Sequence, residues 1–227
     1  MTFLNPVMLR ARFHFLPALA VAMLALALAG CGNSYEWNQK VTVVVETPQG
    51  ERSGSSVMHV TWSGGVPFIV GDARGGGYKL RGEAPAVDLG GGRYLFALLR
   101  GMEGLLHEVF VGGRGGMADA RSSIAGATGR QDVPARLYPM LVTFANVSNP
   151  TSVRRVDHDD LAAAFGLGYS LKAITLEITK DPVTAGPLEK LLGWLGPHPE
   201  PKLGPATGGT TNIPFYRMVS HGDFIRR

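Results

Sequence analysis

The chain has a single cysteine, Cys31, among its 227 residues, and charged residues make up only 18% of the sequence. One cysteine excludes an intramolecular disulfide and any zinc or iron–sulfur site built from clustered cysteines. The sequence also lacks the H-E-x-x-H, G-x-S-x-G and S-x-x-K motifs, and it has no run of five like charges. No catalytic nucleophile can therefore be identified from motif spacing. No cluster of basic residues indicates binding to nucleic acid.

Glycine is the residue in excess, with 31 copies, about twice ordinary usage. The glycines follow no Gly-X-Y period, which excludes a collagen-like chain, and the apolar fraction of 45% excludes a wholly disordered one. Of these glycines, 18 lie between residues 64 and 129. We therefore expect irregular backbone to be concentrated in residues 64–129.

Residues 1–30 contain Arg10 and Arg12, no acidic residue and 22 apolar residues. A cationic start, an apolar run over residues 13–29 and small residues at the end are typical of a secretory signal peptide. A transmembrane helix is the alternative, but it needs about 20 mostly apolar residues, and this run is shorter and contains Pro17. The sequence predicts a signal peptide over residues 1–30, whether translation starts at Met1 or Met8.

The signal ends in Leu28-Ala29-Gly30-Cys31, which resembles the lipobox of bacterial lipoprotein precursors. The resemblance covers about the first 31 residues of the chain. It implies cleavage between Gly30 and Cys31, a diacylglycerol on the Cys31 thiol and a third acyl chain, such as palmitate, on its amine. Two or three acyl chains anchor a protein durably, whereas one does so only marginally. Because residue 32 is glycine and not aspartate, the sorting rule of Gram-negative lipoproteins implies the inner leaflet of the outer membrane, facing the periplasm.

The chain that remains after cleavage has 197 residues, with 20 basic and 18 acidic side chains. That length supports one sizeable hydrophobic core. We expect a lipidated tether over residues 31–37, which can span about 20 Å at most, and a single β-rich domain over residues 38–227.

Alternating apolar and polar residues predict that the domain consists mainly of strands. Val41, Val43 and Val45 precede a turn at residues 47–50, and a second alternation follows, which predicts a β-hairpin with a bulge near residues 53–56. Further strands are expected at residues 67–70, 86–89, 94–98, 140–144, 174–178 and 214–219.

Short helices are expected at residues 102–109, 161–165 and 187–195, where apolar residues recur every three or four positions. For the second of these, Asp157 is the expected N-cap, Asp160 the N3 residue and Gly166 the C-terminal stop. Residues 112–130 are expected to be exposed and mobile, and the proline-rich residues 197–209 to be extended on the surface. The predicted fold class is β-dominated, an all-β sandwich or an α+β fold with mainly antiparallel strands and two or three short helices.

Two motifs suggest ligand sites. Residues 113–118 match the dinucleotide fingerprint G-x-G-x-x-A, and Asp132 lies about 20 residues on, but no βαβ pattern surrounds them. We interpret them as a surface loop and expect no cofactor. Asp157, Asp159 and Asp160 with His158 could bind a divalent cation, but helix capping accounts for the acidic residues without a metal.

Two further groups have a structural interpretation that we favour. His221 and Asp223 could form an acid–base pair, but a turn is favoured because no third partner is assigned. The aromatic residues Trp37, Trp62, Trp194, Phe144 and Phe215 could line a sugar-binding face. Core packing is the favoured interpretation for them.

The leading functional hypothesis is a non-enzymatic envelope lipoprotein with a binding or structural role, attached to the membrane through lipid on Cys31. Its expected partner is another envelope protein, and nucleic acid is not expected. The alternative is an envelope hydrolase or metal-dependent enzyme, which would need a cleft joining His107, His158 or His221 with carboxylates. A third hypothesis is a ligand-binding accessory to a transporter, which predicts a deep pocket.

Overall fold

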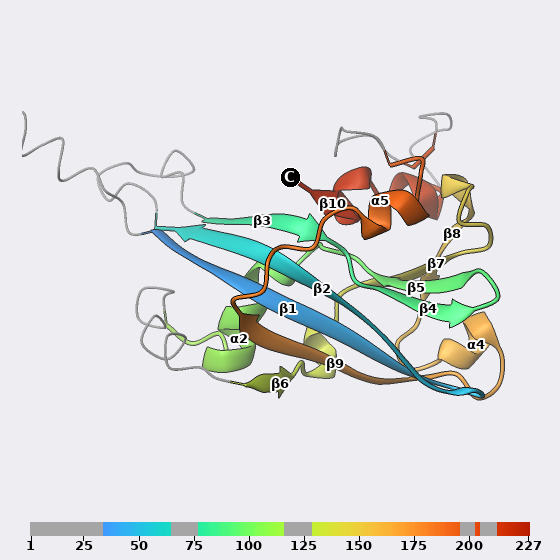
Figure 1. The fold of residues 1–227 in the computed structure, drawn as a ribbon, viewed down its shortest axis with the longest axis horizontal. Coiled ribbons are helices and arrows are strands. Elements are labelled where there is room, and N and C mark those ends of the chain that lie inside the picture. Colours follow the sequence, from blue (N-terminus) through green and yellow to red (C-terminus); the bar gives the residue numbers. More distant parts are fainter. Residues whose placement is uncertain (1–33, 65–76, 116–128, 196–202, 205–212) are drawn as a thin grey trace, which may run out of the picture.

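A computed structural model of the chain describes residues 34–64, 77–115, 129–195, 203–204 and 213–227. The expected signal peptide, its expected cleavage site at Gly30 and Cys31, and the strand expected at residues 67–70 lie outside these ranges, as does most of the proline-rich segment at 197–209. The described chain forms two antiparallel sheets with short helices around them (Figure 1), which confirms the predicted β-dominated fold class.

The larger sheet has six strands in the order β10-β3-β2-β1-β9-β6. Its strands are β1 (Ser34–Thr47), β2 (Gly50–Ser63), β3 (Gly77–Glu83), β6 (Arg130–Asp132), β9 (Ser170–Thr179) and β10 (Ile225–Arg226). β1 begins at Ser34, so regular structure starts inside the segment expected to be a tether. On its other side β1 pairs with β9, and the antiparallel pairing agrees with the alternation over residues 174–178, which predicts an antiparallel strand without naming its partner.

The β1–β2 hairpin turns at Pro48 and Gln49, as predicted, but the predicted bulge near residues 53–56 is wrong. Its register runs from Thr47 opposite Gly50 to Ser34 opposite Ser63 without a shift. The irregularity of β1 lies instead on its β9 side, between Val44 and Val45. The small residues of β2 instead allow the second sheet to lie close to this strand.

That second sheet has four strands in the order β4-β5-β7-β8. They are β4 (Ala86–Gly90), β5 (Arg93–Ala97), β7 (Leu141–Phe144) and β8 (Val153–Val156). All four residues of β7 are buried, as expected for a strand covered on both faces. The turn between β4 and β5 holds Gly90, Gly91 and Gly92 at φ of 84°, 63° and 73°, a left-handed conformation that favours glycine.

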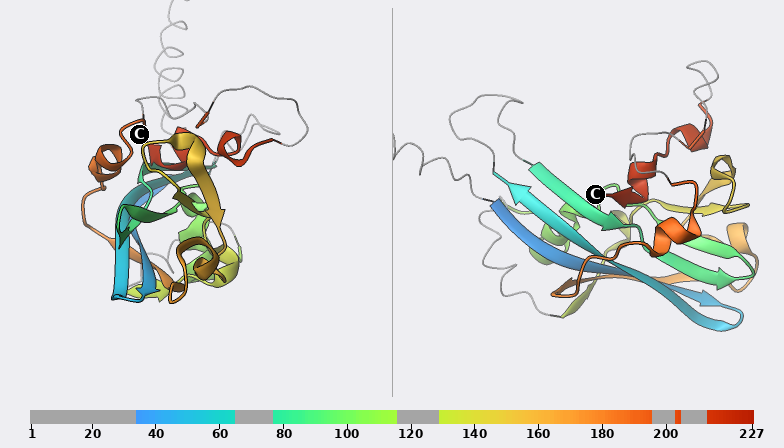
Figure 2. Two further views of the ribbon diagram at one scale, coloured as in Figure 1. Left: turned by 90° about the vertical axis from the view of Figure 1, so that its right-hand side faces the viewer. Right: turned by 45° about the horizontal axis from the view of Figure 1, so that its top comes forward.

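The two sheets approach each other closely where β2 passes β4 (Figure 2). At this point a Cβ atom on Gly54 would lie 1.9 Å from the carbonyl oxygen of Ala86. Nearby, the hydroxyl of Ser56 donates to the carbonyl of Glu83 at 2.6 Å, at the end of β3. Glycine at position 54 thus permits a close approach of the backbones of β2 and β4 that a side chain would prevent.

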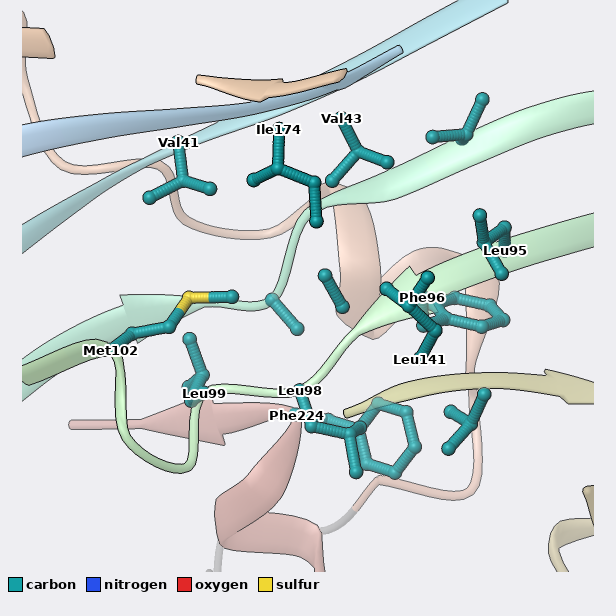
Figure 3. Close-up of a cluster of buried hydrophobic side chains, with 14 of the residues drawn as sticks. Val41, Val43, Leu95, Phe96, Leu98, Leu99, Met102, Leu141, Ile174 and Phe224 are labelled. Atoms are coloured by element: carbon teal, nitrogen blue, oxygen red, sulfur yellow. The ribbon is translucent and has the colours of Figure 1, made fainter. Parts of the chain in front are cut away.

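One hydrophobic core fills the space between the sheets (Figure 3). Alternate residues of β1 enter it from the larger sheet, and Val41 and Val43 are almost fully buried. From the smaller sheet, Phe96 packs edge-on against Phe144 at 5.5 Å and against Phe224 at 5.9 Å between ring centroids. The contact with Phe224 joins the smaller sheet to the C-terminal segment.

Three short α-helices and five 3-10 helices connect the described strands. They are η2 (Met102–Gly104), α2 (Leu105–Val111), η3 (Ala135–Leu137), η4 (Pro150–Ser152), α4 (Leu161–Phe165), α5 (Pro187–Leu191), η5 (Phe215–Arg217) and η6 (His221–Asp223). The helices predicted at 102–109 and 187–195 are present, although α5 ends earlier than predicted. Among the described residues, every helix is too short or too polar to cross a membrane.

The predicted cap of α4 is wrong by three residues. Asp160, not Asp157, is the N-cap, and its side chain accepts from the backbone N–H of Ala163 at 3.0 Å. Asp157 instead closes a separate turn by accepting from the N–H of Asp159 at 3.1 Å. The helix itself covers the predicted residues 161–165, and its first residue, Leu161, is buried.

The strand predicted at residues 214–219 is also wrong, because this segment forms η5. Pro214 precedes the 3-10 turn, and the chain turns again at η6, where Ser220 and Asp223 form a capping box. The strand of this region is β10, which pairs with β3 through Ile225 opposite Glu83.

Candidate functional site

A cleft of about 940 Å³ opens between the end of β5, η3 and the β7–β8 pair. Its floor is apolar and buried, and consists of Met102, Leu105, Leu141 and Val156. Its more exposed lining contains three guanidinium groups and one imidazole, from Arg100, Arg136, Arg155 and His158. Among the described residues that line it, Asp157 is the only carboxylate.

Arg100 is held in place by the buried carboxylate of Asp223. Its Nη2 lies 2.8 Å from Oδ2 of Asp223, its Nε lies 3.2 Å from Oδ1, and Nη2 also donates to the carbonyl of Met218 at 3.1 Å. The Asp223 side chain is only 5% exposed, whereas that of Arg100 is 51% exposed. This two-point contact fixes the guanidinium plane while leaving half of the side chain open to a ligand.

Asp223→Asn should lower the free energy of unfolding by about 2 kcal/mol, because hydrogen bonds to a buried charged acceptor contribute about 1.5–3 kcal/mol. Besides Arg100, Asp223 accepts from the N–H of Ser220 at 2.9 Å and from its hydroxyl at 3.2 Å. The amide NH₂ of asparagine would face N–H or O–H donors that the carboxylate now accepts from, so some of these hydrogen bonds would be lost. Urea unfolding measures the change, with the exposed Asp181→Asn as the matched control. Equal midpoints for the two variants would contradict this role of Asp223.

Arg136 and Arg155 are exposed, and neither forms an ion pair with another described residue. Arg136 lies on η3. Arg155 lies on β8, the last strand of its sheet, where Val153 and Val156 are buried and Arg154 and Arg155 are exposed. Both guanidinium groups are therefore available to an anion at the cleft.

The imidazole of His158 contacts two neighbouring side chains, Asp159 and Tyr138. Its Nδ1 lies 3.0 Å from Oδ1 of Asp159, and its ring packs edge-on against Tyr138 at 5.4 Å between centroids. Potential ligand atoms of Asp157, His158 and Asp159 lie within 4.8 Å of one another. The carboxylate of Asp157 closes its turn, and that of Asp160 caps α4, so capping and turn formation account for both.

The other two histidines singled out from the sequence do not line this cleft. His107 lies on α2, and His221 packs against Trp194 at 5.6 Å between ring centroids. The interpretation of residues 221–223 as a turn is confirmed, since they form η6 and Asp223 binds Arg100. The cleft thus brings His158 together with arginines, a combination that the sequence did not indicate.

Core packing is confirmed for four of the five aromatic residues that could have formed a sugar-binding face. Phe144 belongs to the core, and Trp37, Trp194 and Phe215 pack against it. The indole N–H of Trp194 donates to the carbonyl of Val147 at 2.7 Å. Trp62 differs, because it lies outside the core cluster.

The surroundings of Gly113 and Gly115 do not match those of a dinucleotide fingerprint. That motif must follow a strand and open a helix, but here the glycines follow α2, which ends with Gly112 in the left-handed conformation. Residues 116–118 lie outside the described part of the chain. Asp132 is exposed on β6.

Comparisons with known proteins give no relative: no protein-family model, no curated protein and no solved structure matches this chain. The chemistry of the cleft is therefore the guide to its ligand. An apolar floor flanked by guanidinium groups suits a molecule that has both carboxylates and apolar groups.

Proposed function

We propose that this protein is a membrane-anchored envelope lipoprotein with a non-enzymatic binding role. Lipid on Cys31 holds it to the membrane, and the arginine-lined cleft binds an acidic, partly apolar segment of an envelope partner protein. The resemblance of residues 28–31 to a lipobox supports the anchor. The observation that carries the binding role is the set of guanidinium groups around a buried apolar floor.

The size and polarity of the cleft favour a peptide segment over a small inorganic anion. Its volume of about 940 Å³ is that of a site for a molecule of many atoms. Apolar side chains of the bound segment that leave water at the cleft would contribute about 25 cal/mol per Å². Arg136 and Arg155 would pair with carboxylates in two-point contacts, which fix the orientation of the bound segment.

The side chains at the cleft favour binding over hydrolysis. Among the described residues that line it there is no serine, threonine, cysteine or lysine that could act as a nucleophile. Its one histidine, His158, is hydrogen-bonded to the exposed Asp159. The geometry therefore supports recognition of an anion more directly than acid–base chemistry.

The double variant Arg136→Glu/Arg155→Glu should weaken binding of an acidic peptide at least about tenfold. Each exposed charge pair contributes up to about 1 kcal/mol, about 1.4 kcal/mol corresponds to tenfold, and reversal adds repulsion. Fluorescence anisotropy of a labelled peptide of alternating glutamate and leucine measures the affinity at low and moderate salt.

The matched control is Arg52→Glu/Arg81→Glu, which makes the same change in net charge at two exposed positions outside this cleft. At moderate salt, about 0.1 M, we expect the control to bind the peptide within about twofold of the unmodified protein, because distant charges are then screened beyond about 10 Å. An equal loss in both double variants, or no binding by the unmodified protein at low salt, would refute the cleft as the binding site.

A further inference from the structure

We infer that the end of the larger sheet where β1 begins faces the bilayer, and that the stacked pair Tyr35–Trp62 contacts the lipid interface. This inference rests on the proposed lipidation of Cys31. It assigns an orientation to the domain and a role to Trp62.

The short distance along the chain from Cys31 to β1 limits where this end of the sheet can lie. Only two residues lie between Cys31 and Ser34, and the three Cα-to-Cα steps that join them span at most about 11 Å. Ser34 lies opposite Ser63, and Ser63 lies opposite Gly77, so three strand ends lie side by side (left in Figure 1). The hairpin turn at Pro48 lies about 45 Å away along 14-residue strands.

An aromatic row crosses these strand ends. Tyr35 lies opposite Trp62, and Trp62 lies opposite Tyr78, so all three side chains are on one face of the sheet. The rings of Tyr35 and Trp62 are stacked, with centroids 5.3 Å apart and planes 4° from parallel. Toward the middle of the sheet, the next row on this face contains Val60, which is fully buried.

The members of this row differ in what covers them. Tyr78 packs against the core, and burial raises the pKa of its hydroxyl, with a smaller rise from the nearby Glu108 carboxylate. Tyr35 and Trp62 lie outside the core cluster and are both half-buried. The stacked pair therefore lies beyond the core, at the end nearest the lipid attachment point.

Aromatic rings with a polar atom suit the headgroup region of a bilayer, where tryptophan and tyrosine are enriched. The opposite face of the same strand ends is polar, with Glu36, Thr61 and Lys79 in one cross-strand row. A sheet end with one aromatic and one polar face is suited to the interface. It cannot enter the hydrocarbon, because open strand edges would lose their hydrogen bonds to water.

Fluorescence quenching in vesicles tests this orientation with the full lipidated protein. The double variant Trp37→Phe/Trp194→Phe leaves Trp62 as the only tryptophan, and Trp37→Phe/Trp62→Phe leaves Trp194 as the matched control. The vesicles contain phosphatidylethanolamine and phosphatidylglycerol, with a fraction of lipid brominated near the glycerol end of the acyl chains. We expect Trp62 to lose roughly half of its emission, since a ring at the headgroup level lies beside these bromines, and Trp194 to lose almost none.

Flotation of the same vesicles separates the possible failures. Protein that floats while Trp62 remains unquenched would overturn the inference and leave the lipid anchor intact. Protein that does not float would refute the anchor, and with it the orientation that depends on it. If loss of the bond from Trp37 Nε1 to Gln39 Oε1 (3.0 Å) impairs folding, quenching of the unmodified protein minus that of Trp62→Phe gives the same quantity.

Discussion

Gly54→Ala should destabilise the protein by at least about 3 kcal/mol, a large part of the stability of an ordinary domain. The added Cβ would lie 1.9 Å from the carbonyl oxygen of Ala86, 2.5 Å from its carbonyl carbon and 2.9 Å from the nitrogen of Val87. These are backbone atoms at the start of β4, so no side chain can rotate away. The two sheets would have to separate locally, which would disturb the packing of the core between them.

Urea unfolding followed by tryptophan fluorescence measures this effect. Gly193→Ala is the matched control, because its Cβ would have no atom within 4 Å and its backbone is not left-handed. The control should unfold within about 0.5 kcal/mol of the unmodified protein. A Gly54→Ala protein that unfolds at the same urea concentration as the control would contradict the close approach of β2 and β4.

Cys31→Ala should move the protein almost completely from the membrane fraction to the soluble fraction. Each buried methylene contributes about 0.8 kcal/mol to membrane binding, so the loss of two or three acyl chains removes the anchor. The substitution also removes the thiol on which the proposed diacylglycerol is attached. Aromatic contacts such as the Tyr35–Trp62 stack are too small to hold the domain on the membrane alone.

Fractionation of cells followed by immunoblotting measures the distribution, and Ser34→Ala is the matched control. Ser34 lies three residues further along the chain, is exposed at the start of β1 and has no part in the proposed lipidation. The control should remain with the membranes. Retention of the Cys31→Ala protein in washed membranes would refute anchoring through Cys31.

The strands of the core could be predicted because their sequences alternate. Val41 and Val43 in β1, and Ile174 and Leu176 in β9, show the period of two that one buried face requires, and all four are buried. The turn at Pro48 could be predicted from local residue preferences. These features depend on residues that are close together in the sequence, so one sequence is enough to predict them.

Features that depend on distant neighbours could not be predicted. From the sequence, Gly54 suggested a bulge. The actual reason for a glycine is the Ala86 carbonyl, which lies in the other sheet and therefore cannot be inferred from the residues next to Gly54. Asp157 and Asp160 are both suitable N-caps by residue type, and the structure places Asp160 at the cap, directly before the buried Leu161. The segment expected to form a strand at residues 214–219 contains a 3-10 turn instead, and the Met218 carbonyl after this turn accepts from the distant Arg100.

The sequence gives little indication that the three arginines of the cleft lie close together. Arg100, Arg136 and Arg155 lie on three separate segments, and the pairing of β5 with β7 and of β7 with β8 brings these segments together. No motif spacing links the three residues. The pair of arginines between buried valines in β8 is the one local pattern that could have drawn attention to the site.

The most direct test of the lipid anchor is the mass of the N-terminal peptide of the protein purified from membranes of its host. We expect a peptide that begins at Cys31 and carries a diacylglycerol on sulfur and an acyl chain on the amine. A peptide that begins at Met1 or Met8, or one that begins at Cys31 with an unmodified thiol, would contradict the lipid anchor.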